Sequence, residues 1–343
     1  MAYTTINKST AHFNTKLYTG NDTGQSITGV GFQPDWVWIK SRSNTNQHNL
    51  FTPLYTGFLE SDTSDAVNGV TNGVTAYGAD GFTVGNRDAV NDNNLNFASW
   101  NWKAGGGAGS ANTDGSINST VSVNTTAGFS IVKYVGDGGM TTTVGHGLGV
   151  VPQVILIKNL ETATNWTMYH HSMGNTGQLY LDTTTSFTTD ADTFKNTTPT
   201  STLWTMSNSS KTNQGSRNHI AYCFAEKTGY SKFGSYTGNT NNGDGTFVYT
   251  GFKPAFIMVK NTARSQNWSM HDSKRPGYNE VNQRLQANLS DAEASNNKVD
   301  LLSNGFKWRT NDGDTNGYAE QHIYMAFAEA PLVGSNNVPC TAR

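Results

Sequence analysis

Hydrophobic positions along the chain are densest in three short runs that each follow a proline. The runs occupy residues 36–40, 154–158 and 255–260, behind Pro34, Pro152 and Pro254, and each ends on a lysine. Both alternating sets of positions are apolar, which is the pattern of a strand covered on both faces. Because proline is tolerated at the start of a strand but not inside a central one, we expect each proline to begin a strand.

The alternation assigns the apolar side chains of these three strands to two faces. We expect one face to carry Val37, Ile39, Ile155, Ile157, Ile257 and Val259, and the other to carry Trp36, Trp38, Val154, Leu156, Phe256 and Met258. A sandwich strand normally needs one apolar face. The second face therefore predicts a second cover, either a neighbouring part of the chain or a partner chain.

Other features keep their distance from these prolines, which indicates three internal repeats. A Tyr-(Thr/Val)-Gly-(Asn/Asp) turn precedes each proline, at 18–21, 134–137 and 236–239. An aromatic strand follows each proline by about 50 residues, at 82–84, 204–206 and 306–308. A closing aromatic strand follows each proline by about 70 residues, at 100–102, 222–224 and 325–327. Trp166 and Trp268 both lie 14 residues after their proline (166 − 152 and 268 − 254), where repeat one has His48. Repeat one is therefore the divergent copy in this strand.

Units of this length, with short strands and Gly/Asn turns, are typical of antiparallel β-sandwiches. We predict an all-β chain of three tandem, jelly-roll-like sandwich repeats with little helix, in which the uncovered strand faces favour a homo-oligomer, possibly a trimer, or a close cluster of the repeats. The predicted parts are an N-terminal arm (1–12), repeat one (13–104), a linker (105–128), repeat two (129–228), repeat three (229–330) and a tail (331–343).

Two segments are predicted to depart from this plan. The stretch 104–128 is rich in Gly, Ala, Ser, Asn and Thr, a composition typical of flexible linkers, so repeat one should have more freedom than the other two. Leu285, Leu289 and Ala292 have helical spacing, which predicts a short helix within 280–302.

Composition and charge exclude several classes of partner. The formal net charge is −2 and 14% of residues are charged, so no basic field exists for nucleic acid. The chain lacks both a signal-peptide core at its N-terminus and a run of about 18 apolar residues, so we predict neither export nor membrane insertion. Cys223 lies in an apolar run, which suits folding in a reducing compartment.

A turn in repeat three has partial calcium-loop character. Asp312, Asp314 and Asn316 alternate around a glycine, but the bidentate glutamate expected later in such a loop would fall on Ile323. We interpret the segment as a turn between strands and predict no metal and no cofactor.

Candidates for binding and catalysis are few. Lys40, Lys158 and Lys260 recur in all repeats; a solvated lysine at a strand end accounts for them better than a ligand role. Glu226 and Glu329 recur after closing strands, but repeat one has Ala104 there, and no catalytic residues are predicted. For a glycan, aromatic residues outside the recurring core positions are the remaining candidates, namely Tyr55, Tyr77, Tyr169 and Tyr278.

The repeat motifs resemble a known group of proteins. The segments 17–21, 26–40, 100–104, 221–226 and 339–343 together resemble virion proteins from tailed phages of marine bacteria, including cyanophages. This resemblance implies a virion structural or tail-fibre-like protein assembled in the host cytoplasm, with other virion proteins, its own copies and a host surface glycan or protein as partners. It implies no catalytic residues.

Together these arguments predict a non-enzymatic component of a phage particle, with a tail-fibre or host-attachment role favoured. The arm 1–12 and the tail from Pro331 are the segments expected to dock onto neighbouring virion proteins. Capsid decoration or a head fibre is the first alternative. A tailspike depolymerase that degrades host glycans is the second.

Overall fold

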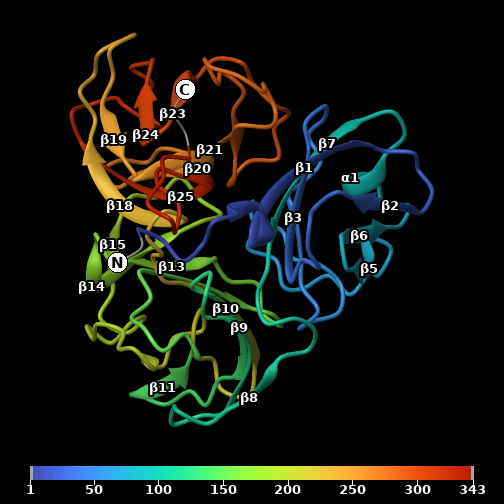
Figure 1. The fold of residues 1–343 in the computed structure, drawn as a ribbon. Helices are drawn as coiled ribbons and strands as arrows, with labels where there is room; N and C mark the ends of the chain where they lie inside the picture. The colour runs from blue at the N-terminus through green and yellow to red at the C-terminus, as the bar shows by residue number, and fades with distance from the viewer. Residues whose placement is uncertain (1–2, 341–343) are drawn as a thin grey trace.

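The computed structural model describes residues 3–340, and its regular structure is almost entirely β, as predicted (Figure 1). Within this range the exceptions are the 3-10 turn η1 (Ser9–Ala11) and the one-turn helix α1 (Asp88–Asn91). The strands pair antiparallel in several sheets. No helix among the described residues has the length and apolar character needed to cross a membrane.

Each repeat is a sandwich of an inner and an outer sheet. In repeat one the inner sheet has the order β1 (Phe13–Thr19), β7 (Asn96–Trp102), β3 (Trp36–Ser41), β4 (Asn49–Phe51). Its outer sheet has the order β2 (Gln25–Thr28), β6 (Gly81–Val84), β5 (Val74–Gly78). β3, which follows Pro34, therefore lies centrally in its sheet, hydrogen-bonded to β7 and β4.

Repeats two and three have the same inner-sheet order. In repeat two it is β10 (Phe129–Val135), β17 (Asn218–Phe224), β12 (Val154–Asn159), β13 (Thr167–His170), continued by β14 (Gly174–Tyr180) and β15 (Thr188–Thr189), with β11 (Thr142–Gly145) and β16 (Leu203–Met206) outside. In repeat three it is β18 (Ser231–Thr237), β25 (Gln321–Pro331), β20 (Phe252–Asn261), β21 (Trp268–Asp272), β22 (Leu285–Gln286), with β19 (Phe247–Tyr249), β24 (Gly305–Trp308) and β23 (Val299–Leu302) outside. We call β3, β12 and β20 the origin strands, and each is hydrogen-bonded on both edges. β3 and β12 begin two residues after their proline, but β20 begins before Pro254, so the expectation that each proline begins a strand is wrong for repeat three. The ladder tolerates Pro254 because its register shifts there.

Two segments differ from the sequence-based prediction. The expected flexible linker instead forms β8 (Ser110–Asn112) and β9 (Ser119–Asn124), which extend the inner sheet of repeat two beyond β10. Small polar residues alternate there with Val121 and Val123, so the segment has the period of a half-buried strand despite its composition. The helix expected within 280–302 is also wrong, because Leu285 pairs with Met270 in the sheet, Leu289 and Ala292 lie in irregular structure, and β23 (Val299–Leu302) follows.

The origin strands bury both faces as predicted, and the second cover comes from the same chain. Val37, Ile155 and Ile257 face the outer sheet of their own repeat, in three separate clusters. Trp36, Trp38, Val154, Leu156, Phe256 and Met258 meet in one cluster that all three repeats share, which we call the central core. The three sandwiches thus surround a common centre, seen as three lobes in Figure 1.

The central core is closely packed. Closing-strand side chains join it from every repeat, and rings from different repeats touch, with the Trp36 and Tyr222 centroids 4.3 Å apart and those of Phe224 and Phe327 5.8 Å apart. A void of about 10 Å³ remains at the middle. Uncovered strand faces were the feature that favoured a homo-oligomer, and because the three repeats cover these faces, that reason for self-association is removed.

Backbone hydrogen bonds join the repeats in a closed ring. The residue eight positions after each proline accepts a backbone N–H from the preceding repeat: Val67 N–H donates to Leu160 O at 2.9 Å, Phe187 N–H to Thr262 O at 2.9 Å and Glu293 N–H to Arg42 O at 3.0 Å. Each junction joins the same two surfaces, and three such steps return to the start. This is the geometry of a heterologous interface whose rotation closes.

A second ring of hydrogen bonds explains the positions of Trp166, Trp268 and His48. Trp166 Nε1 donates to Glu60 O at 2.7 Å and Trp268 Nε1 to Tyr180 O at 2.8 Å, each in the preceding repeat. His48 Nε2 contacts Gln286 O of repeat three at 3.1 Å. Repeat one differs in sequence at this position, yet its histidine makes the same kind of junction contact.

The recurring lysines are buried, so the prediction of solvated strand-end lysines is wrong. Lys40, Lys158 and Lys260 have no exposed surface, and each ammonium is hydrogen-bonded to backbone carbonyls. Lys158 Nζ donates to Ser64 O of repeat one at 2.8 Å, and Lys260 Nζ to Thr184 O of repeat two at 2.9 Å. Two of the three lysines therefore tie adjacent repeats together.

The Tyr-x-Gly-(Asn/Asp) turns are also structural. The tyrosine hydroxyl donates to a backbone carbonyl in Tyr18 to Val90 O, Tyr134 to Thr212 O and Tyr236 to Thr315 O. The residue after each accepting carbonyl is a fully buried asparagine, whose Oδ1 accepts a backbone N–H from the turn; these are Asn91, Asn213 and Asn316. Glycine is required because a Cβ on Gly20 would lie 2.1 Å from Asp92 O.

The buried lysines predict an unusual pH dependence. Burial lowers the pKa of Lys40, Lys158 and Lys260 from 10.5 to about 8. Above pH 8 the native lysines lose protons that the unfolded chain still holds, so the free energy of unfolding should increase with pH. Burial raises the pKa of the Cys223 thiol, which acts in the opposite direction. We expect a net increase on the order of 2–4 kcal/mol between pH 8 and 9.5.

Urea unfolding at pH 7, 8, 9 and 9.5 measures this effect. Lys158→Met removes one lysine while keeping a long apolar stem, so it should lower overall stability and remove about a third of the lysine contribution to the pH slope. A wild-type stability that is flat or decreasing over this range, or an unchanged slope in the variant, would contradict the prediction.

Candidate functional site

A loop that departs from the common repeat plan lies at the junction between repeats three and one, which we call the seam. In repeat two, three residues separate β13 from β14, whereas twelve residues (273–284) separate the corresponding β21 and β22. The first part of this loop lies at the seam. Residues that belong to one repeat alone are the natural place to look for function, because the recurring positions serve packing.

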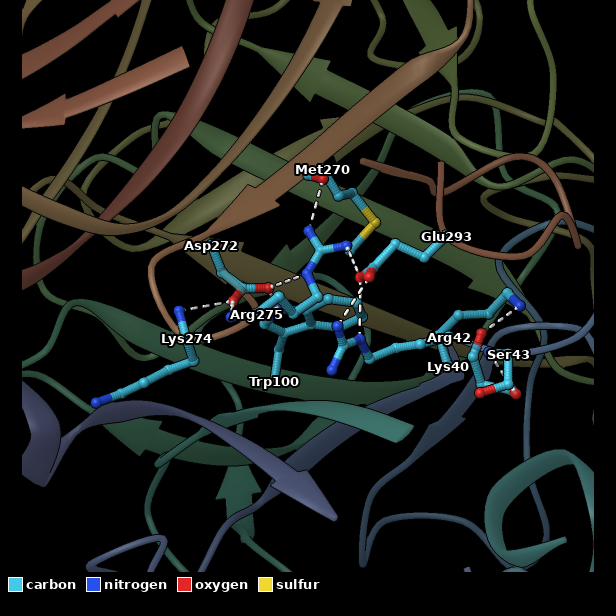
Figure 2. Close-up of polar contacts among 10 residues, drawn as sticks. Lys40, Arg42, Ser43, Trp100, Met270, Asp272, Lys274, Arg275 and Glu293 are labelled. Carbon is cyan, nitrogen blue, oxygen red and sulfur yellow. Dashed lines mark hydrogen bonds and ion pairs between the residues drawn. The ribbon is translucent and has the colours of Figure 1, made fainter. Parts of the chain in front are cut away.

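A buried ionic cluster anchors the start of the loop (Figure 2). The Arg275 guanidinium is fully buried; Nε donates to Asp272 Oδ2 at 2.6 Å, Nη2 to Met270 O at 2.9 Å and Nη1 to Glu293 Oε2 at 3.0 Å. Trp100 Nε1 of repeat one donates to the same Asp272 oxygen at 3.1 Å. Every polar end of this arginine is therefore paired inside the protein.

Glu293 carries the cluster across the seam to repeat one. Its carboxylate accepts two hydrogen bonds from Arg42, Nη2 to Oε1 at 2.8 Å and Nε to Oε2 at 3.0 Å, in addition to that from Arg275. Figure 2 shows both guanidinium groups directed at this carboxylate. Two arginines and two carboxylates balance in charge, which lowers the cost of burying them.

The loop above the cluster forms one wall of a polar cavity in repeat three. The cavity has a volume of about 230 Å³ and is lined by Lys253, Ser273, Lys274, Gly277, Tyr278, Asn279, Val281, Leu301 and Glu329. The Tyr278 side chain is 80% exposed, whereas Ser273 Oγ is buried with no hydrogen-bond partner within the described residues. Lys253 Nζ lies 3.2 Å from Glu329 Oε2, and Glu329 is the one carboxylate that the described chain contributes to this lining.

A second cavity, of about 290 Å³, lies on the repeat-one side and shares Lys274 with the first. It is lined by Asn14, Thr15, Lys16, Leu17, Gly29 and Lys274. Thr15 is 5% exposed, and its Oγ1 is buried with no hydrogen-bond partner in the described chain. In Figure 2 the Lys274 side chain extends away from the Arg275 guanidinium. We call the two cavities together the seam groove.

The sequence-based ligand candidates separate clearly in the structure. Tyr278 lies in the seam groove with its ring exposed, whereas Tyr169 is 3% exposed and packs in the interior of repeat two. Tyr55 and Tyr77 are half-buried and pack against apolar clusters, with the Tyr55 hydroxyl donating to Leu50 O at 2.9 Å. The structure does not bring these four residues together, and it corrects Tyr169, because a buried ring offers no face to a sugar.

The calcium-like turn is occupied by an arginine and by hydrogen bonds. Arg284 Nη1 lies 3.1 Å from Asp314 Oδ2 and 3.4 Å from Asp312 Oδ2, and the Asn316 amide is hydrogen-bonded to repeat-three turns. A guanidinium thus stands where a cation would lie. Among residues 3–340 there is no group of three or more His, Cys, Asp and Glu side chains placed to hold a metal ion.

The two recurring glutamates have different surroundings. Glu329 is paired with Lys253 in the seam groove, whereas Glu226 is exposed in repeat two, where its backbone N–H donates to Gln153 Oε1 at 2.7 Å. Sequence reasoning missed Thr15, Lys16, Ser273 and Lys274. The available signal was the unmatched loop length after β21 in repeat three.

The cluster beneath the groove predicts a strong effect of Glu293. Glu293→Gln removes the carboxylate that both Arg42 and Arg275 contact and leaves charge without its partner at the seam. Because breaking a buried ion pair is costly, we expect the free energy of unfolding to decrease by about 2–4 kcal/mol in urea. Lys298→Ala is the control, since it breaks an exposed pair with Glu280 and should cost less than about 1 kcal/mol. Equal losses in the two variants would refute the role assigned to the cluster.

Comparison with known proteins places the chain in a family. The family described as Domain of unknown function (DUF7483) matches residues 8–331, which include the described β-strands of all three repeats and both sides of the seam groove. No curated protein and no solved structure matches the chain. The protein belongs to the DUF7483 family.

Proposed function

We propose that the protein is a non-enzymatic structural component of a phage particle that contacts the host surface, and that the seam groove is its contact site. It would be assembled in the host cytoplasm and carried on the virion. The observation that carries this proposal is a polar groove with an exposed aromatic ring, held on a rigid β scaffold.

The scaffold supports a binding role because its recurring residues are already occupied. The lysines, the turn tyrosines and the buried asparagines all satisfy hydrogen bonds inside the molecule. The ring of junctions fixes the repeats, so loops at a seam present their side chains in one arrangement. Sites on a rigid scaffold lose little conformational entropy when they bind a ligand.

The groove chemistry favours binding over hydrolysis. Glycoside hydrolysis uses two carboxylates on either side of the scissile bond. Within residues 3–340, Glu329 is the one carboxylate lining the two cavities, and Lys253 holds it in an ion pair. Lysines, hydroxyls, an amide and an aromatic ring are the groups that recognise polar ligands such as glycans.

The terminal segments support attachment of the body to other virion proteins through one region. Asn7 Nδ2 donates to Ser335 Oγ, and Ser335 N–H donates to Asn7 Oδ1, both at 2.7 Å. The described parts of the arm and the tail therefore lie side by side. Ile6 enters the central core, while Val338 is exposed and available to a neighbour.

Localisation on the particle tests the proposal. Gold-labelled antibodies against the protein, viewed on intact particles by electron microscopy, should mark the tail, and quantitative gel analysis should give a few dozen copies per particle. Label over the head with hundreds of copies would replace attachment by capsid decoration. Particles without label would overturn the virion assignment.

The depolymerase alternative has its own test. Purified protein incubated with host envelope glycans should release no reducing sugar above a buffer control. Release that disappears in Glu226→Gln and Glu329→Gln variants would show an enzyme and sink the non-enzymatic proposal.

A further inference from the structure

We infer that the seam groove binds a carboxylate-bearing saccharide that spans the junction between repeats three and one. This inference rests on the proposed contact role of the groove and names the class of ligand.

The charge of the groove is positive although the whole chain is slightly acidic. Lys16, Lys253 and Lys274 line the two cavities, against Glu329. Lys253 is neutralised by Glu329 at 3.2 Å. Lys274 forms no salt bridge with any described residue, and Lys16 forms none either, although its charge reaches the exposed Asp80 carboxylate and helps to lower the pKa of that group. This excess of positive charge in neighbouring cavities favours a ligand with negative charge.

The Arg275 cluster limits how those lysines could be neutralised from within. Asp272 and Glu293, the two carboxylates of this cluster, are both paired with arginines, and Asp272 also accepts the backbone N–H groups of Lys274 and Arg275. Lys274 lies between these groups and the surface, with its backbone N–H donating to Asp272 Oδ1 at 3.0 Å. Its ammonium therefore remains available to a ligand.

Two residues of the lining have a hydroxyl group without a hydrogen-bond partner among residues 3–340. Thr15 lines the repeat-one cavity and Ser273 lines the repeat-three cavity, and the hydroxyl oxygen of each is buried. Buried polar groups are normally hydrogen-bonded, so an unpaired one in a cavity wall favours a ligand that supplies the partner. Saccharide hydroxyl and carboxylate groups supply both donors and acceptors.

The shape fits a short chain rather than a single small ion. The cavities measure about 230 and 290 Å³, and Lys274 belongs to both. The exposed Tyr278 ring offers an apolar face for a sugar ring in the repeat-three cavity. Nucleic acid is a poorer fit, because a net charge of −2 provides no extended basic surface for its backbone.

Calorimetric titration with trigalacturonic acid tests the inference, with maltotriose as the neutral probe of equal length and inorganic phosphate as the simple anion. We expect trigalacturonic acid to bind at least tenfold more tightly than either of the other two. Lys274→Ala and Lys16→Ala should each weaken its binding by about tenfold, as expected on losing a charge-assisted contact. Tyr278→Ala should weaken trigalacturonic acid and leave phosphate unchanged.

Lys103→Ala is the matched control, since Lys103 is an exposed lysine outside both cavities. This variant should bind trigalacturonic acid as tightly as the wild type does. Thermal unfolding midpoints equal to wild type confirm that each variant is folded. The inference would be overturned if maltotriose or phosphate bound as tightly as trigalacturonic acid. It would also be overturned if Lys103→Ala weakened the binding of trigalacturonic acid as much as Lys274→Ala does, or if trigalacturonic acid did not bind at 10 mM. If the protein binds trigalacturonic acid as expected but is not found on phage particles, the saccharide site stands and the proposed virion role fails.

Discussion

The burial of both faces of the origin strands is the constraint on which the rest of the structure depends. Each inner sheet covers one face with its own outer sheet and has a second apolar face left over. One sandwich cannot bury that face alone. Leaving the face exposed would lose the roughly 1.5–3 kcal/mol that full burial of each aromatic or large aliphatic side chain contributes. Three copies arranged as a closed ring cover one another, and the ring hydrogen bonds then fix their register.

Much of the scaffold could be predicted from the sequence, because apolar alternation reports directly on burial. The two faces of the origin strands agree residue by residue with the prediction, Trp36 on one side and Val37 on the other. The burial of the lysines could not be predicted, because carbonyls that bind Lys158 and Lys260 come from loops of another repeat. His48 shows the same limit, since its contact with Gln286 depends on a junction between distant segments.

The seam groove was largely invisible in the sequence for a related reason. Thr15 and Lys16 belong to the first strand of repeat one, whereas Ser273 and Lys274 lie more than 250 residues later. Ring closure alone brings them together. Tyr278 was a candidate because it falls outside the recurring apolar positions, and the same criterion selected Tyr169, which is buried. Departure from a repeat therefore identifies unusual residues without telling surface from interior.

The three junctions are equivalent in backbone but not in side chains, and this difference relates the site to the fold. At the equivalent positions the junctions hold Val67 with Leu160, Phe187 with Thr262, and Glu293 with Arg42. The first two junctions join repeats that follow each other in the chain, whereas the seam joins repeats one and three, which are not consecutive. A bidentate ion pair there adds geometric specificity to closure. Because the cluster also holds Arg275, the same charges that close the ring position the loop that carries Lys274 and Tyr278.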